Sequence, residues 1–228
     1  MKMSQRTRIK ICGLTREEDV AAAVQAGADA IGFVFYPKSP RFVTPARAAE
    51  LVRSLPPFVS SVGLFVNASL EELRQVLMQV PLSLLQFHGD ETPAQCAELA
   101  AATVRPFVRA ARIGASTTPA DLLEYERAYR SASPFFCGLL LDTLVEQYGG
   151  SGKVFDWSLI PKELAPRAVL SGGLSVLNAT EAVAGVRPYA VDISSGVEAA
   201  KGIKDAAKIN AFIDAVRLAD AVPLPASN

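Results

Sequence analysis

Residues 30–35 read Ala-Ile-Gly-Phe-Val-Phe, and residues 137–142 read Cys-Gly-Leu-Leu-Leu-Asp. Both stretches are apolar at nearly every position and lack the alternation of apolar and polar residues that marks a strand with one face in water. Strands that are covered on both faces have this pattern, and they belong mainly to parallel sheets packed between helices. The two stretches therefore favour a parallel α/β fold.

Short apolar or β-branched stretches of this kind recur along the whole chain. The eight strands that we predict are Arg8–Ile11, Ala30–Phe35, Ser60–Val66, Leu84–Phe87, Arg105–Ala110, Phe136–Leu141, Ala168–Ser171 and Ala190–Ile193. An open doubly wound sheet usually has fewer strands and a nucleotide fingerprint after the first of them. The strand count therefore favours a closed barrel.

Amphipathic segments separate the predicted strands. Helix starts are indicated at Thr15-Arg-Glu-Glu, Thr44-Pro45, Ser69-Leu-Glu-Glu and Thr92-Pro93. Further helices are predicted at Asp121–Arg130, Trp157–Lys162, Val176–Ala184 and Asp205–Leu218. Because no proline- or serine-rich linker divides the chain, we predict a single-domain (β/α)8 TIM barrel over residues 1–228, with a frayed tail after about residue 219.

Composition limits the classes of partner. The 23 basic and 23 acidic residues cancel, so no net field attracts nucleic acid or an anionic membrane. The three cysteines are widely spaced, which predicts neither a disulfide framework nor a metal site. The chain shows no secretory signal and no apolar run of membrane-spanning length. We expect a cytoplasmic protein, either a monomer or a homodimer, without nucleic-acid or membrane partners.

Small and polar residues cluster where the predicted strands end, at the mouth where barrel enzymes build their active sites. Glycines follow the seventh strand, and hydroxyl residues with a glycine follow the eighth. Backbone N–H groups in such loops can hold a phosphate. The residues concerned are Gly172, Gly173, Ser194, Ser195 and Gly196. They predict a phosphorylated small-molecule substrate, although glycines at these places also suit tight turns.

Two residues at strand ends are candidates for acid–base chemistry. Cys12 is followed by Gly13 and a helix start, where N–H dipoles and nearby cations favour a thiolate. Asp142 closes an apolar run, and a carboxyl group partly desolvated there can hold and donate a proton. Each also has a structural interpretation, Cys12 as a small buried hydrophobe and Asp142 as a cap or loop anchor. Cys96 and Cys137 are assigned to packing.

Three further polar residues stand at strand ends or in the loops that follow them. Arg41 can hold a substrate carboxylate, although a solvated surface arginine is the default interpretation. Asp192, at the end of the eighth strand, has the same two interpretations as Asp142, an acid–base group or a structural cap. His88, the only histidine, is interpreted as a hydrogen-bonded wall residue in preference to a catalyst.

The segment Gly149–Lys153 reads Gly-Gly-Ser-Gly-Lys. It is not a nucleotide P-loop, because Gln147 replaces the first glycine of that motif and Val154 follows the lysine. We interpret the segment as a mobile lid over the barrel mouth, with a plain flexible loop as the alternative.

Several ordered motifs resemble those of the phosphoribosylanthranilate isomerase family. They are Lys10-Ile-Cys-Gly-Leu-Thr, Gly32-Phe-Val-Phe-Tyr-Pro-Lys-Ser-Pro-Arg-Phe, Leu64-Phe-Val-Asn, Leu85-Gln-Phe-His-Gly-Asp-Glu, Leu141-Asp-Thr, Gly149-Gly-Ser-Gly, Leu170-Ser-Gly-Gly-Leu and Val191-Asp-Ile-Ser-Ser-Gly-Val-Glu. The motifs cover nearly the whole chain without a departure at the motif positions. The resemblance implies a (β/α)8 isomerase of tryptophan biosynthesis that needs no cofactor and no metal.

The resemblance also implies a division of labour in an Amadori rearrangement of N-(5-phosphoribosyl)anthranilate. Asp142 is expected to be the general acid at the furanose ring oxygen, and Cys12 the general base at C2. Arg41 is expected to hold the anthranilate carboxylate, and Asp192 to contact the anthranilate amine. The loops that carry the candidate phosphate ligands would take the phosphate, while His88 and Lys10 line or underlie the site.

Other phosphate-binding barrels compete with this interpretation. A histidine-pathway sugar isomerase is expected to carry Asp in place of Cys12. An indole-glycerol-phosphate synthase needs a lysine acid and an added N-terminal segment, whereas this chain begins about seven residues before the first predicted strand. Outside the enzymes, the alternative is a barrel that binds a phosphorylated metabolite without converting it. An acid, a base and a carboxylate clamp at one mouth argue against that alternative.

Overall fold

The computed structural model describes residues 6–144 and 154–221, which contain a closed barrel of parallel strands. The barrel strands are β1 (Arg8–Cys12), β2 (Ala30–Val34), β3 (Ser60–Phe65), β4 (Leu84–Phe87), β5 (Phe107–Ile113), β6 (Phe136–Thr143), β7 (Val169–Leu170) and β8 (Ala190–Ile193). Each strand pairs with the next in sequence, and β8 pairs with β1. The predicted barrel is therefore confirmed.

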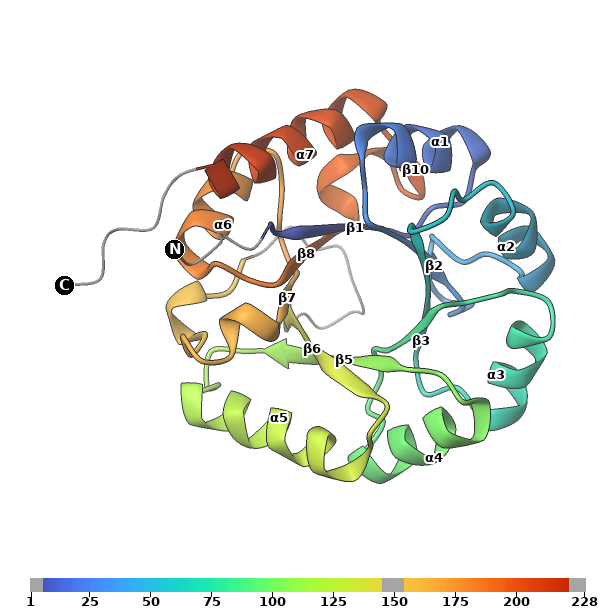
Figure 1. Ribbon diagram of the computed structural model, residues 1–228, viewed down its shortest axis with the longest axis horizontal. Helices are drawn as coiled ribbons and strands as arrows, with labels where there is room; N and C mark the ends of the chain where they lie inside the picture. The colour runs from blue at the N-terminus through green and yellow to red at the C-terminus, as the bar shows by residue number, and fades with distance from the viewer. Residues whose placement is uncertain (1–5, 145–153, 222–228) are drawn as a thin grey trace.

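Helices surround the barrel as an outer ring (Figure 1). They are α1 (Glu17–Ala26), α2 (Pro45–Val52), α3 (Leu70–Leu77), α4 (Pro93–Thr103), α5 (Pro119–Ala132), α6 (Ala179–Val186) and α7 (Ala206–Ala221), with short 3-10 turns η1 (Trp157–Leu159), η2 (Ala165–Arg167) and η3 (Ser195–Val197). Thr44, Ser69 and Thr92 each accept a hydrogen bond from the backbone N–H three residues later, so these three predicted caps are confirmed. None of the described helices is long and apolar enough to cross a membrane.

Two predictions about helices are wrong. Thr15 does not cap α1, because its hydroxyl donates 2.8 Å to the carbonyl of Gly202 and the helix begins only at Glu17. The helix expected at Trp157–Lys162 is only the turn η1. Pro161 has no N–H and restricts the residue before it, and Ile160 is accordingly extended, with φ −78° and ψ 115°.

Some expected boundaries also shift. The strand expected from Arg105 begins at Phe107, after Pro106, which has no N–H for the sheet. Helix α6 begins at Ala179 because the chain first makes a turn closed by Asn178, whose side-chain oxygen accepts from the N–H of Ser175. Helix α7 continues to Ala221, past the point where fraying was expected, and the rest of that tail lies outside the described residues, as does the expected lid Gly149–Lys153.

Side chains alternate along each strand between the barrel interior and the surrounding helices. Phe33, Phe65, Phe87 and Phe107 are completely buried in the hydrophobic core that includes the helices. The alternate positions on these strands and their neighbours point inward and include polar groups. Cys96 is buried as expected, but Cys137 is exposed, so its assignment to packing is wrong.

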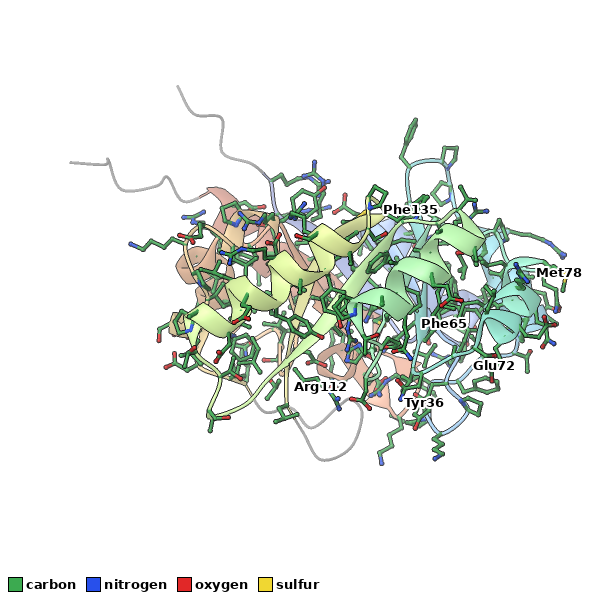
Figure 2. The ribbon with its side chains drawn as sticks, turned by 90° about the horizontal axis from the view of Figure 1, so that it is seen from below. Tyr36, Phe65, Glu72, Met78, Arg112 and Phe135 are labelled. Carbon is green, nitrogen blue, oxygen red and sulfur yellow. The ribbon has the colours of Figure 1, made fainter. Side chains whose placement is uncertain are left out.

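The two ends of the barrel differ in what they carry. Figure 2 shows Tyr36 and Arg112, which lie at the carboxyl ends of β2 and β5, at one end, and Phe135, which precedes β6, at the other. A small antiparallel hairpin of β9 (Glu198–Ala200) and β10 (Ile203–Lys204) follows β8. This hairpin was not predicted from the sequence. It returns Lys204 to the loop after β8, where Lys204 Nζ lies 3.0 Å from the carbonyl oxygen of Ser194.

Candidate active site

A cavity of about 860 Å³, including the part open to solvent, lies at the carboxyl ends of the strands. Its lining includes every predicted site residue except Gly196. A Cβ at Gly196 would lie 2.0 Å from the carbonyl oxygen of Leu174, so this glycine permits close contact between the last two barrel loops. In the described part of the chain, no group of three or more His, Cys, Asp or Glu side chains could hold a metal ion.

Asp142 at the end of β6 is held by the only histidine. His88 Nε2 lies 3.0 Å from Asp142 Oδ2, and Gln86 Nε2 lies 3.0 Å from His88 Nδ1. The second carboxylate oxygen of Asp142 accepts from the N–H of Thr143 at 2.9 Å. His88 is therefore a hydrogen-bonded wall residue, as predicted, and its partner is the candidate acid.

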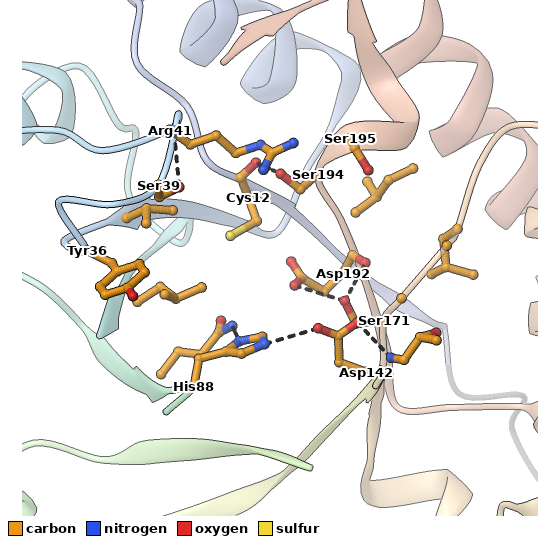
Figure 3. Close-up of a pocket in the computed structure, with 18 of the residues that line it drawn as sticks. Cys12, Tyr36, Ser39, Arg41, His88, Asp142, Ser171, Asp192, Ser194 and Ser195 are labelled. Carbon is orange, nitrogen blue, oxygen red and sulfur yellow. Dashed lines mark hydrogen bonds and ion pairs between the residues drawn. The ribbon is translucent and has the colours of Figure 1, made fainter. Parts of the chain in front are cut away.

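Cys12 lies on the opposite side of the pocket from Asp142, with Asp192 between them (Figure 3). Burial raises the pKa of the Cys12 thiol, and the nearby ammonium of Lys10 offsets part of that effect. The expected help from a helix start is absent because α1 begins only at Glu17. Nearby cations are present as expected, but they come from Lys10 and from Lys204 on β10.

Asp192 is paired beneath the cavity. Lys10 and Asp192 are direct partners in the register of β1 and β8, and Lys10 Nζ lies 2.7 Å from Asp192 Oδ1. The Ser171 hydroxyl lies 3.4 Å from Asp192 Oδ2. Lys10 therefore underlies the site and does not line it, whereas Asp192 does both.

Arg41 is buried and ion-paired, not a solvated surface arginine. Its Nε and Nη2 donate to the two carboxylate oxygens of Glu198 at 2.7 and 2.9 Å. Lys204 Nζ lies 3.0 Å from the same carboxylate. Burial alone would raise the pKa of Glu198, but the hydrogen bonds from Arg41 and the charge of Lys204 lower it below its ordinary value. Nη1 of Arg41 has no carboxylate partner among the described residues.

The loops after β7 and β8 line the cavity beside these groups. Gly172 and Gly173 have φ of 79° and 67°, in the left-handed region that favours glycine. Their backbone N–H groups donate hydrogen bonds to none of the residues that the structure describes. Ser194 and Ser195 line the same cavity. The arrangement suits an anion, which would accept hydrogen bonds from such groups.

Several polar residues of this site were not predicted from the sequence. Gln86 and Ser171 sit within or next to apolar strands, and their alternation with buried apolar neighbours would have placed them inside the barrel. Glu198 was noted only as part of a motif, and its pairing with Arg41 joins residues 157 positions apart. Lys204 lies on the unpredicted hairpin. For these last two residues no local sequence signal indicates the partner.

Comparisons with known sequences point to one family. The family model described as "PRAI: N-(5'phosphoribosyl)anthranilate (PRA) isomerase" matches residues 9–215. A curated protein of Herminiimonas arsenicoxydans, named N-(5'-phosphoribosyl)anthranilate isomerase, is 67% identical over 219 residues, which are 96% of this chain and 96% of that protein.

Solved structures give the same result. Phosphoribosyl anthranilate isomerase from Thermotoga maritima superposes with a TM-score of 0.81 at 43% identity, over 92% of this chain and 98% of that one. A phosphoribosyl anthranilate isomerase in complex with reduced 1-(o-carboxyphenylamino)-1-deoxyribulose 5-phosphate superposes with a TM-score of 0.78 at 40% identity, over 92% and 98% of the two chains.

Proposed function

Because the chain belongs to the N-(5'-phosphoribosyl)anthranilate isomerase family of tryptophan biosynthesis, we propose that it converts N-(5-phosphoribosyl)anthranilate into 1-(2-carboxyphenylamino)-1-deoxyribulose 5-phosphate by an Amadori rearrangement. Reactant and product are isomers. The protons lost from C2 and from the C2 hydroxyl are balanced by those gained at C1 and at the ring oxygen, and no electron donor or acceptor enters the reaction.

Asp142 is the general acid of the first step. Its carboxyl group protonates the furanose ring oxygen, the C1–O bond breaks, and the lone pair of the anthranilate nitrogen forms a C1=N double bond. The hydrogen bonds from His88 and from the N–H of Thr143 fix the carboxyl group at the cavity wall. A positioned acid of this kind contributes about 10²- to 10⁴-fold to a rate.

Cys12 is the general base of the second step. Its thiolate removes the C2 proton, the C–H electrons form a C1=C2 double bond, and the electrons of the C1=N bond return to nitrogen. The resulting enol then becomes a ketone, as the C2 hydroxyl loses its proton and C1 gains one. The observation that carries this proposal is the placement of Cys12 and Asp142 on opposite sides of one cavity, because acid and base must act on different atoms of one sugar (Figure 3).

Fixed donors orient the two anionic ends of the substrate. Arg41 holds the anthranilate carboxylate with the Nη1 edge that Glu198 leaves unused. Gly172, Gly173, Ser194 and Ser195 hold the phosphate. The compound bound to the 40% identical relative carries both a carboxyphenyl group and a phosphate, which supports this pairing of donors and anions.

Asp192 and His88 complete the substrate-binding wall. Asp192 lies between the acid and the base and accepts from the anthranilate amine, whose positive charge grows as the C1=N bond forms (Figure 3). Lys10 and Ser171 hold this carboxylate in place from below. His88 contacts the substrate from the wall beside Asp142.

The decisive experiment is a coupled assay that supplies phosphoribosylanthranilate and follows loss of its anthranilate-type fluorescence. We expect rapid loss with the wild-type chain. Cys12→Ala and Asp142→Ala should each abolish the loss while the circular dichroism spectrum and phosphate-ligand binding are retained. Unchanged fluorescence with folded wild-type protein would refute the assignment, and near-normal turnover in either variant would remove that residue from the mechanism.

A further inference from the structure

Lys10 is a buried cation for which the proposed reaction has no direct use. Its side chain is only 9% exposed, and it is absent from the cavity lining. It stands two residues before Cys12 on β1, so both side chains point into the barrel. Burying an ammonium is costly unless it is paired, and Asp192 supplies one partner at 2.7 Å.

The Lys10 ammonium and the Cys12 sulfur converge on one point above β2. Cys12 is the register partner of Gly32. A Cβ placed on Gly32 would lie 2.9 Å from Cys12 Sγ and 3.0 Å from Lys10 Nζ. Any other residue at position 32 would push the two atoms away from that point, so the glycine provides the space in which the ammonium faces the sulfur.

We propose that Lys10 is a positioning residue whose ammonium stabilises the thiolate form of Cys12 against the cost of burial, and that Gly32 provides the close approach that this requires. The use of the thiolate as the C2 base rests on the proposed function. The charge relationship itself is a property of the unliganded protein and can be tested without substrate.

The groups that face Cys12 act in opposite directions. Lys10 on β1, Lys204 on β10 and Asp192 on β8 act on the thiol, while Tyr36 and Arg41 after β2, His88 after β4 and Asp142 on β6 line the same cavity. Burial and Asp192 disfavour the thiolate, while the two ammonium groups favour it. Burial lowers the pKa of Lys10, but the neighbouring carboxylate and sulfur raise it by more, so Lys10 stays protonated.

Asp192 therefore has two effects that can be separated. It holds the Lys10 ammonium in place, and its own negative charge opposes a thiolate next to it. Removal of the Lys10 charge and removal of the Asp192 charge should shift the pH at which Cys12 ionises in opposite directions. A purely structural role for the pair predicts no such opposition, because either substitution would then only loosen the same contact.

The test measures alkylation of Cys12 by iodoacetamide against pH, with the modified residue identified by mass spectrometry. Cys137→Ser serves as the background because Cys137 is the exposed cysteine. Cys96 does not interfere, since burial raises its pKa to about 12. The variants in this background are Lys10→Met, Lys10→Arg and Asp192→Asn, with Lys201→Met as a control that removes an exposed lysine charge.

We expect Lys10→Met to raise the pH midpoint of alkylation by about one unit or more, a tenfold or greater fall in rate at neutral pH. Asp192→Asn should lower the midpoint, and Lys10→Arg and Lys201→Met should leave it near the wild-type value. Gly32→Ala, which changes no charge, should raise the midpoint because it separates the ammonium from the sulfur.

The proposal is overturned if folded Lys10→Met keeps the wild-type midpoint, or if Lys10→Met and Asp192→Asn shift it in the same direction. Should Lys10→Met fail to fold, Gly32→Ala and Asp192→Asn decide the question by the same readout. If the variants show the expected midpoint shifts but the wild-type chain has no isomerase activity, the proposed function is refuted and the charge relationship stands.

Discussion

His88 Nε2 lies 3.0 Å from Asp142 Oδ2, and this contact links the wall of the cavity to the proposed acid. The opposite ring nitrogen faces Gln86 Nε2 at 3.0 Å. An amide nitrogen only donates, so these contacts predict that His88 Nδ1 accepts and that Nε2 carries the proton directed at the Asp142 carboxylate. They therefore predict a single tautomer of the imidazole.

This tautomer can be measured directly because the chain contains a single histidine. We expect the ¹⁵N spectrum of imidazole-labelled protein to show a protonated Nε2 and an unprotonated Nδ1 for the neutral ring. Gln86→Leu removes the donor to Nδ1 and should give a mixture of tautomers. A spectrum with Nδ1 protonated in the wild-type chain would contradict this hydrogen-bond pattern.

Asp142→Asn should lower kcat/KM by about 100-fold or more, because the amide keeps the size of the side chain but has no acidic proton to give to the ring oxygen. Affinity for a non-reacting product analogue should change by less than about threefold, since Asp142 is not one of the groups proposed to bind the anionic ends. Asp214→Asn, at an exposed position of α7, is the matched control and should keep wild-type kinetics. Equal losses in both variants would argue against a specific role for Asp142.

Glu198→Gln should raise KM more than it lowers kcat, because Arg41 loses the carboxylate that orients its guanidinium. Steady-state kinetics would separate these two effects. A fall confined to kcat would show that Arg41 does not depend on Glu198 for substrate binding.

The same variant should have a pH-dependent stability defect. Breaking a buried ion pair costs about 3 kcal/mol. The folded-state pKa of Glu198 lies below its ordinary value of 4.5, so ionised Glu198 stabilises the fold above that pH and the contribution is lost as the pH falls through the lowered pKa. Urea denaturation should therefore show the full gap between wild type and Glu198→Gln at pH 7 and a smaller gap below about pH 4. A difference in unfolding free energy that stays the same from pH 7 to below about pH 4 would contradict the lowered pKa of Glu198.

Gly172→Ala should reduce both stability and turnover. The residue has φ 79°, and a Cβ there would lie 2.4 Å from the backbone nitrogen of Thr143 and 2.7 Å from Asp142 Oδ1. The added methyl group therefore displaces the proposed acid as well as the proposed phosphate-binding loop, and we expect about a tenfold or greater loss of kcat/KM.

The matched control is Gly185→Ala within α6, where a Cβ would meet nothing within 4 Å. That change should stabilise the protein by about 0.5–1 kcal/mol, because alanine favours helix more than glycine does, and it should leave kinetics unchanged. Thermal denaturation and the fluorescence assay would measure both variants. Wild-type activity in Gly172→Ala would show that the loop tolerates the displacement.

The chain order of apolar stretches was enough to predict the barrel, because strands that are buried on both faces have a local signature. It was also enough to indicate the mouth, since Cys12, Asp142, Gly172 and Asp192 each follow or end such a stretch. Errors arose where a local rule met a competing contact. The Thr15 hydroxyl donates to the carbonyl of Gly202 and does not cap α1. Pro161 ends a segment that otherwise resembled a helix.

The sequence by itself determined the number and order of the strands and which residues stand at their carboxyl ends, because backbone propensity and side-chain alternation act over a few neighbouring positions. Only the tertiary structure decided how those residues pair. Lys10 meets Asp192 across 182 positions, because barrel closure aligns β1 with β8. Burial then reversed the expectation for Cys12, whose pKa is raised, since desolvation depends on every element that surrounds the thiol and not on the residues beside it in the chain.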